Sequence, residues 1–159
     1  MRILGVDPGL KATGYGLIEA NHLKVALIET GTIEPKRQYL FEKRIQVVYD
    51  NLQALIQEYH PEVLVLEKIY AHTKHPATAS IMGHVRGAIC LLCAQNNIDL
   101  AEHSVKRIRK AVCGNGNAPK GQIQRVVARA LGIPAEQLTL DASDALALAL
   151  GFVHINRVF

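Results

Sequence analysis

The segment at residues 141–150, with the sequence DASDALALAL, constrains the fold more than any other part of the chain. From Ala142 on it is built almost entirely of alanine and leucine, so it predicts a helix that is apolar around most of its circumference and buried. Yet Asp141 and Asp144, three residues apart, project from neighbouring points on one face at its start. The chain therefore places two carboxylates beside its own core.

The apolar pattern elsewhere alternates between strand and helix. Apolar residues recur every three to four positions from 38 to 59, which predicts a long amphipathic helix. Gly114 and Gly132 are expected to end helices. In all, strands are expected at 2–7, 14–20, 23–33, 62–67 and 98–103, the second and third antiparallel, and helices at 38–59, 76–97, 104–113, 120–131 and 141–155. This order predicts an α/β fold with a mixed sheet and helices on both faces, in a single domain over residues 1–159.

Two further carboxylates terminate buried strands. Asp7 ends the first strand and Glu67 ends the strand at 62–67. Open α/β sheets keep their sites at the carboxyl ends of their strands, so neighbouring strands would set these two side chains next to each other. Asp141 and Asp144 could complete the group. Four carboxylates in a half-buried pocket repel one another unless divalent cations neutralise them.

Each acid also has a plainer interpretation. Asp7 precedes Pro8 and Gly9 and could be a turn residue, and Glu67 could be a solvated strand end. Asp141 could cap the last helix, and Asp144 could be a first-turn acid favoured by the helix dipole. Taken together, these interpretations require four unrelated coincidences at positions that can converge.

Positive charge is concentrated in one third of the chain. The net charge is +4, but the acid-free interval between Glu102 and Glu136 contains seven cationic residues, which leaves about −3 for the rest. They are Lys106, Arg107, Arg109, Lys110, Lys120, Arg125 and Arg129. A solvated helix face is the plainer interpretation, whereas the lack of compensating acids favours binding to a polyanion such as nucleic acid.

Other features limit the classes of protein that fit. Three cysteines are an odd count, which predicts reduced thiols in the cytoplasm. The sequence contains no apolar run long enough to predict a membrane span, and its first residues do not predict a signal peptide. The CLLC at 90–93 has no second pair for zinc, so both thiols are expected to be buried. The GNGNAPKG at 114–121 lacks the Walker spacing for nucleotide binding.

Four blocks, in this order and at these separations, resemble the RuvC family of Holliday-junction resolvases. They are ILGVDPGLKATGYGLI, VLEKIYAHTKHPATASIMGHVRGAI, GNGNAPKGQIQRVV and DASDALALAL. The resemblance implies a ribonuclease H-like fold with a mixed five-stranded sheet, a homodimer, and magnesium-dependent cleavage of four-way DNA junctions. It also implies that Asp7, Glu67, Asp141 and Asp144 are the catalytic, metal-binding acids.

The resemblance extends to the DNA-binding residues. The family's loop lysine is matched by Lys120, whereas Arg109 stands where the family has a lysine in the helix beginning at Ser104. Arginine keeps the charge but donates a proton less readily, so Lys106 or Lys110 could share that work, with Arg107 beside them. Tyr70 matches an aromatic position that stacks on unpaired bases; alone, it could be a rim tyrosine.

Carboxylate ligands and phosphodiester hydrolysis suit two Mg²⁺ ions, for which Mn²⁺ can substitute. Four-way junction DNA, a second copy of the chain and a RuvA/RuvB-type branch-migration complex are the expected partners. A related nuclease for RNA–DNA hybrids or other RNA stays open as an alternative. An actin-like or sugar-kinase ATPase needs a second comparable domain, for which 159 residues are too few. A non-catalytic DNA-binding module gives no reason to retain four acids.

Overall fold

The structure is a computed structural model that describes residues 1–21, 24–68 and 76–158, without the side chains of 76–78. The strands are β1 (Arg2–Asp7), β2 (Thr13–Ala20), β3 (Val25–Ile33), β4 (Val63–Glu67) and β5 (Asp99–His103). The helices are α1 (Phe41–Tyr59), α2 (Pro76–Asn96), α3 (Val105–Cys113), α4 (Lys120–Leu131) and α5 (Leu140–Asn156), with a 3₁₀ turn η1 at Ala135–Gln137. None of these described helices is both long and apolar enough to cross a membrane.

The strands form one mixed five-stranded sheet, as predicted. Its order is β3-β2-β1-β4-β5. β1, β2 and β3 pair antiparallel as a meander, whereas β4 pairs parallel with β1 on one side and with β5 on the other. The two parallel crossovers each contain a helix, as such connections require.

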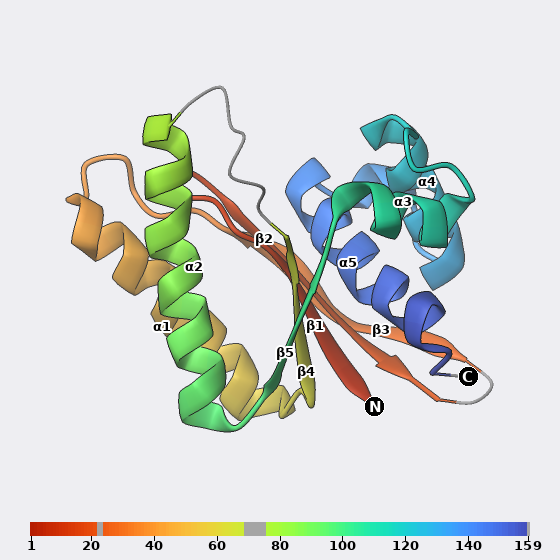
Figure 1. Ribbon diagram of the computed structural model, residues 1–159, viewed down its shortest axis with the longest axis horizontal. Helices are drawn as coiled ribbons and strands as arrows, with labels where there is room; N and C mark the ends of the chain where they lie inside the picture. The colour runs from red at the N-terminus through yellow and green to blue at the C-terminus, as the bar shows by residue number, and fades with distance from the viewer. Residues whose placement is uncertain (22–23, 69–75, 159) are drawn as a thin grey trace.

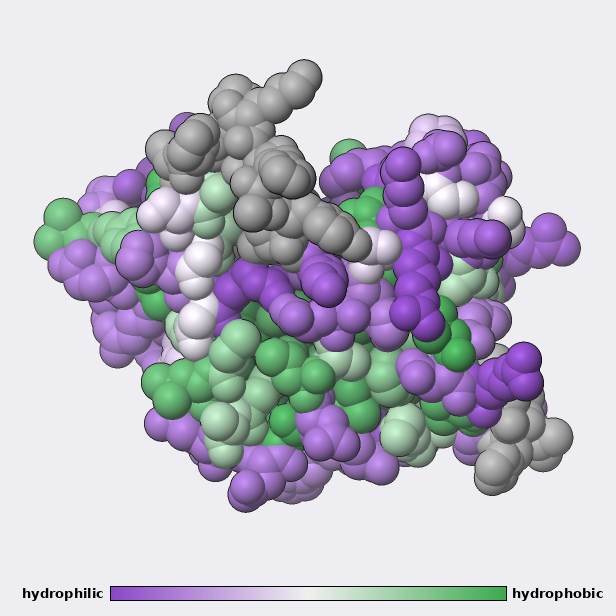
Figure 2. Space-filling model, in the orientation of Figure 1, coloured by the Kyte–Doolittle hydropathy of each residue, from purple (hydrophilic) through white to green (hydrophobic). Residues whose placement is uncertain are grey.

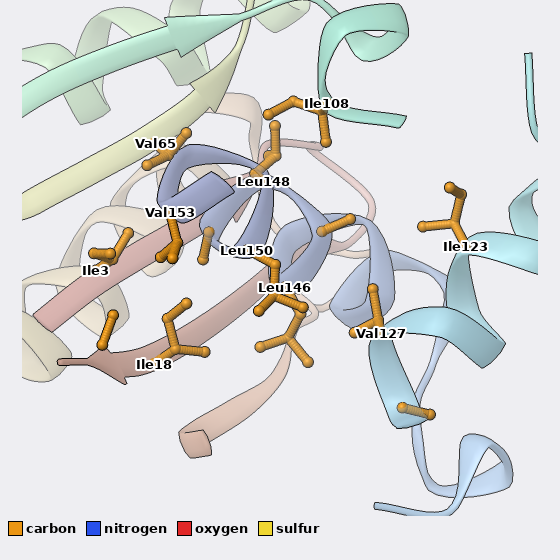
Figure 3. Close-up of a cluster of buried hydrophobic side chains, with 14 of the residues drawn as sticks. Ile3, Ile18, Val65, Ile108, Ile123, Val127, Leu146, Leu148, Leu150 and Val153 are labelled. Atoms are coloured by element: carbon orange, nitrogen blue, oxygen red, sulfur yellow. The ribbon is translucent and has the colours of Figure 1, made fainter. Parts of the chain in front are cut away.

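Helices cover both faces of this sheet (Figure 1). α1 and α2 lie on one face, and α5 crosses the other with α3 and α4 stacked against it. Side chains alternate along each strand, so Ile3 of β1 packs toward α5 while its neighbour Leu4 packs toward α1 and α2. Figure 3 shows the α5 side, where Leu146, Leu150 and Val153 pack with aliphatic side chains of the strands.

The last helix lies unusually close to the strands beneath it. A Cβ atom added to Gly5 of β1 would collide with the backbone carbonyl of Ala145, and one added to Gly14 of β2 would collide with the carbonyl of Asp141. Strand glycines of this kind mark a close backbone approach. Every residue of α5 from Ala145 to Gly151 is buried, as its alanine-leucine sequence predicts, whereas the last turn is partly exposed.

Several boundaries and one burial prediction need correction. α1 begins at Phe41 rather than 38, because residues before it form a turn. The cap of α5 is Thr139, whose hydroxyl accepts from the backbone N–H of Ala142, so Asp141 is not the cap. The prediction that both CLLC thiols are buried is wrong for Cys90, which is exposed because it lies on the outer side of α2. Gly114 and Gly132 end their helices with positive φ, as expected.

Candidate active site

The two strand-end carboxylates lie on adjacent strands. β1 and β4 are parallel neighbours with Val6 paired to Leu66, so Asp7 and Glu67 follow at the same edge of the sheet. Strand alternation places both on the side of α5, since Val65 faces that helix. The predicted convergence of these two residues is confirmed.

The close approach of α5 brings the second pair to the same place. Gly14 is the antiparallel partner of Asp7, and the space beside Gly14 is filled by the backbone of Asp141. Asp141 lies in the first turn of α5 and Asp144 follows one turn later. The start of this buried helix is therefore held against the strand that carries Asp7.

A cavity of about 210 Å³ opens where these elements meet. Asp7, Glu67 and Asp144 line it, whereas Asp141 does not, although its charge is close enough to raise the pKa of Asp7. The other lining residues are Val105, Ile108, Arg109, Lys120, Ile123, Ala147 and Leu148. The wall opposite the carboxylates thus comes from α3 and α4.

Lys120 is the first residue of α4 and supplies a cation to this cavity. Its Nζ donates a 2.5 Å hydrogen bond to Oδ2 of Asp144. This bond to Asp144 raises the pKa of the Lys120 ammonium, and the charges of Asp7 and Asp141 add to the effect. Lys120, which the sequence marked as the family's loop lysine, therefore lies against the carboxylates of the cavity.

The carboxylates carry more negative charge than their surroundings neutralise. Burial, followed by the charges of Asp144 and Glu67, raises the pKa of Asp7 from 3.8 to about 7. Burial and Asp144 also raise the pKa of Glu67, against the opposing effects of Arg109, Lys120 and Arg86. Buried like charges raise carboxyl pKa values in this way, and such shifts are concentrated at functional sites.

The chemistry of the donors fits a hard divalent cation. Carboxylate oxygens are the ligands that Mg²⁺ and Mn²⁺ prefer, and a dication would offset the repulsion that raises the pKa of Asp7. Within the described ranges, no three acidic, cysteine or histidine side chains stand ready as a preformed metal cage. Instead, the ammonium group of Lys120 pairs with the carboxylate of Asp144 and acts as its counter-ion.

The predicted basic residues separate into two groups. Arg109 lines the cavity, with its Nη1 donating to the carbonyl of Ala118 at 2.9 Å, and Lys106 lines an adjoining pocket together with Glu67. Arg107 and Lys110 are exposed on α3 and do not line the cavity. Tyr70 lies outside the described residues.

The sequence interpretation missed Arg86. This residue of α2 donates from Nη1 to the backbone carbonyl of Glu67 at 2.5 Å and also pairs with Glu102 of β5. It holds the end of β4 from the face opposite α5. A lone cation within a small-residue apolar helix, in an interval without acids, was the available signal.

Comparisons with known proteins agree with this geometry. The family model described as Crossover junction endodeoxyribonuclease RuvC matches residues 3–152. The protein of that name from Bordetella pertussis is 37% identical over 159 residues, covering 98% of this chain and 85% of the relative. That from Chloroherpeton thalassium is 39% identical over 150 residues, covering 94% and 80%.

Solved structures agree in fold. The structure titled T. thermophilus RuvC in complex with Holliday junction substrate superposes with a TM-score of 0.91 at 22% identity, covering 99% of this chain and 95% of that one. The fowlpox virus Holliday junction resolvase superposes with a TM-score of 0.63 at 16% identity, covering 98% and 99%. The ribonuclease H-like fold is thereby confirmed. With its sequence matched along nearly its whole length, the chain belongs to the RuvC family of crossover junction endodeoxyribonucleases.

Proposed function

We propose that this chain is a divalent-metal-dependent endodeoxyribonuclease that resolves four-way DNA junctions by paired symmetric nicks. The observation that carries the proposal is the meeting of Asp7, Glu67 and Asp144 with Lys120 in one cavity, in a chain of the RuvC family. A site that is anionic at its floor and cationic at its wall suits a phosphodiester, whose charge needs support on both sides of the scissile bond.

The four acids are the proposed metal ligands. Asp7, Glu67, Asp141 and Asp144 would hold two Mg²⁺ ions, for which Mn²⁺ can substitute. Such ions, when bound, activate water and stabilise charge on the leaving oxygen. Asp7 is the most central ligand of the four, because its pKa responds to each of the other three. Its raised pKa also means that metal binding at neutral pH releases a proton from this carboxyl.

Lys120 and Arg109 act on the phosphate. The Lys120 ammonium remains protonated at neutral pH, since its pKa is raised. Its partner Asp144 is one of the proposed metal ligands, so metal binding would break this ion pair. Once released, the ammonium can donate to a phosphate oxygen. Arg109 is held by the carbonyl of Ala118, which leaves guanidinium donors free to face the cavity and grip phosphate in a fixed orientation.

DNA lies across α3 and α4 in this proposal. Lys106, Arg107 and Lys110 extend the positive surface along α3, outside the cavity, and would contact backbone phosphates. Tyr70, three residues after Glu67, would stack on an unpaired base at the junction centre. DNA as the substrate and the reduced thiols make the cytoplasm the expected compartment, and a RuvA/RuvB-type branch-migration complex is the expected partner.

A homodimer through α2 would supply the second active site that paired nicks require. Gly83 and Gly87 have open space where a Cβ would stand, while Leu91 is 55% exposed on the same helix and Leu100 of neighbouring β5 is 38% exposed. Figure 2 shows apolar atoms gathered over α2 and β5 on this face. Small residues allow close helix approach, and exposed leucines supply the area to bury.

The deciding experiment is cleavage of a synthetic four-way DNA junction with and without Mg²⁺, beside a linear duplex and an RNA–DNA hybrid of the same sequence. Paired nicks in the junction alone, absent with chelator, are expected. Cleavage of the hybrid in preference to the junction would contradict the proposal and favour the alternative ribonuclease.

The dimer has its own test in Leu91→Lys, with Lys24→Ala as a surface control on the β2–β3 turn. We expect Leu91→Lys to shift the chain toward monomer in sedimentation analysis and to convert paired nicks into single nicks. An unchanged sedimentation profile would remove α2 from the dimer interface.

A further inference from the structure

A second basic surface lies on the other helix layer, away from α3 and α4. Lys11, Lys36, Arg37 and Arg44 line an open concavity of about 690 Å³ together with Ala12, Glu34 and Pro35. Four cations therefore face one carboxylate. None of these four belongs to the acid-free interval. The β1–β2 loop contributes Lys11, and the β3–α1 connection with the first turn of α1 contributes the other three.

Hydrogen bonds connect the concavity to the loop that follows β1, the strand that ends in Asp7. Arg44 of α1 donates from Nη2 to the carbonyl of Leu10 at 2.6 Å, which joins the helix to this loop. Thr13 closes the loop on itself, since its hydroxyl donates to the carbonyl of Gly9 at 2.7 Å and accepts from the N–H of Gly9 at 3.2 Å. Lys11 is thus presented from a braced loop four residues after Asp7.

The register of the sheet places both basic surfaces at one edge. Asp7 pairs with Gly14, and Thr13 pairs with Ile33, the last residue of β3, so the segment 34–37 leaves the sheet where β1 ends. Figure 1 shows α1 beginning at this same end of the sheet, while α5 begins there on the opposite face. The carboxylates at the ends of β1 and β4 therefore lie between a basic α3–α4 surface and a basic α1-side concavity.

We propose that this concavity binds backbone phosphates of a junction arm, on the side of the scissile phosphate opposite to α3 and α4. The inference rests on the proposed junction-resolving function. Duplex backbone presents phosphates at regular intervals, and four cations spread over an open surface match such a row better than they match one small anion, which needs convergent donors. Among the described residues, none that lines it is an aromatic or large apolar side chain on which a free base could be held.

The contribution of each residue follows from its setting. Arg44 donates to the carbonyl of Leu10, and its Nε is buried with no partner among the described residues, so it serves chiefly as a brace while its positive charge still adds to the concavity. Arg37 is exposed and free to fork onto a phosphate. Lys36 extends over the Tyr39 ring, with Nζ 6.0 Å from the ring centroid, and Lys11 completes the row. Glu34 limits the total charge.

The test is the double variant Lys36→Ala/Arg37→Ala, which removes two cations without touching the brace or the carboxylates. Junction affinity is measured in chelator, so that no cleavage occurs, across a series of salt concentrations. We expect affinity to fall about 10-fold at low salt and the slope of log affinity against log salt to lessen by about 1.8, since each lost phosphate contact removes about 0.9. Lys24→Ala, a charge removed at the opposite edge of the sheet, should leave both quantities unchanged.

Several readouts separate the possible results. Cleavage at saturating junction and Mg²⁺ should proceed at the parent rate, because the residues of the cavity are intact; thermal melting of the variant should match the parent. An unchanged affinity and salt slope would overturn the inference while leaving the proposed function standing. The inference would also be overturned if dilute pyrophosphate stabilised the parent but not the variant, while both bound the junction equally well. A parent chain that binds no junction would overturn both.

Discussion

The two faces of the sheet are built differently, although the same strands serve both. On the α1–α2 face, leucine, isoleucine and valine side chains of strands and helices separate the two layers. On the α5 face, Gly5 and Gly14 let a helix backbone lie directly against the strands. Side-chain packing holds layers together on either face, but close backbone approach also fixes where the helix begins. The α5 face carries the carboxylates, and a fixed start of α5 holds Asp141 and Asp144 beside Asp7.

The largest expected effect separates the faces by function. Asp7→Asn should reduce junction cleavage at least about 1,000-fold, because it removes the carboxylate central to the site and with it several kcal/mol of transition-state stabilisation. Junction binding should remain. The matched control is Asp50→Asn, an exposed acid of α1 on the other face, which should cleave at the parent rate. Strand cleavage on denaturing gels measures both, and equal activity of the two variants would contradict the assignment of the site.

The next effect concerns packing. Gly14→Ala should lower the free energy of unfolding by about 3 kcal/mol, because the new methyl would push the start of α5 away from β2. Gly83→Ala on α2 meets open space and should raise the free energy of unfolding by about 0.5–1 kcal/mol, since alanine favours a helix. Urea denaturation compares them at a protein concentration low enough to keep the chain monomeric, so that the proposed dimer contact of Gly83 does not contribute. A Gly14→Ala protein as stable as the parent would refute the close-approach argument.

Arg86 connects the two faces, and its removal should have an intermediate effect. Arg86→Ala deletes the donor that holds the carbonyl of Glu67, so we expect cleavage to fall about 10- to 100-fold, the range typical of residues that orient metal ligands. The Mg²⁺ concentration for half-maximal cleavage should rise, while junction affinity in chelator stays constant. Arg86→Lys should recover part of the loss. Reduced affinity with an unchanged Mg²⁺ requirement would assign Arg86 to DNA binding instead.

The smallest effect is a pH dependence of stability. The pKa of Asp7 is about 7 in the folded chain against an ordinary value of 3.8, so protonation of this carboxyl stabilises the fold. That stabilisation is complete below about pH 4 and is lost as the pH rises through about 7. Without divalent cations, Asp7→Asn should therefore become more stable than the parent by about 1–3 kcal/mol at pH 8. Denaturation in chelator from about pH 4 to about pH 8 tests it, and a pH-independent difference would contradict the raised pKa.

The order of elements and the convergence of the acids could be predicted from the sequence. Period-two and period-3.6 patterns gave the strands and helices within a few residues, and carboxyl-end positions placed Asp7 beside Glu67. The apolar helix at the end of the chain correctly indicated a central, buried element. These features depend on local periodicity and on general rules of α/β sheets.

Contacts between distant segments could not be predicted in this way. Arg86 reaches the carbonyl of Glu67 across 19 positions, and the α1-side concavity gathers Lys11 with Arg37 and Arg44 only after β3 has paired with β2. The exposure of Cys90 likewise depends on which side of α2 is covered. Such features arise from the orientation of whole elements, which no short pattern encodes.

The burial of α5 has a consequence for how this protein fails. Its first turn carries Asp141 and Asp144, and most of the rest of it packs in the core, so one continuous helix joins these two acids to the structural centre. We therefore expect heat or denaturant to abolish the arrangement of these two acids only when the whole fold is lost. Inactivation and global unfolding are thereby one cooperative event, and a weakened variant will be an all-or-none mixture of working and unfolded molecules.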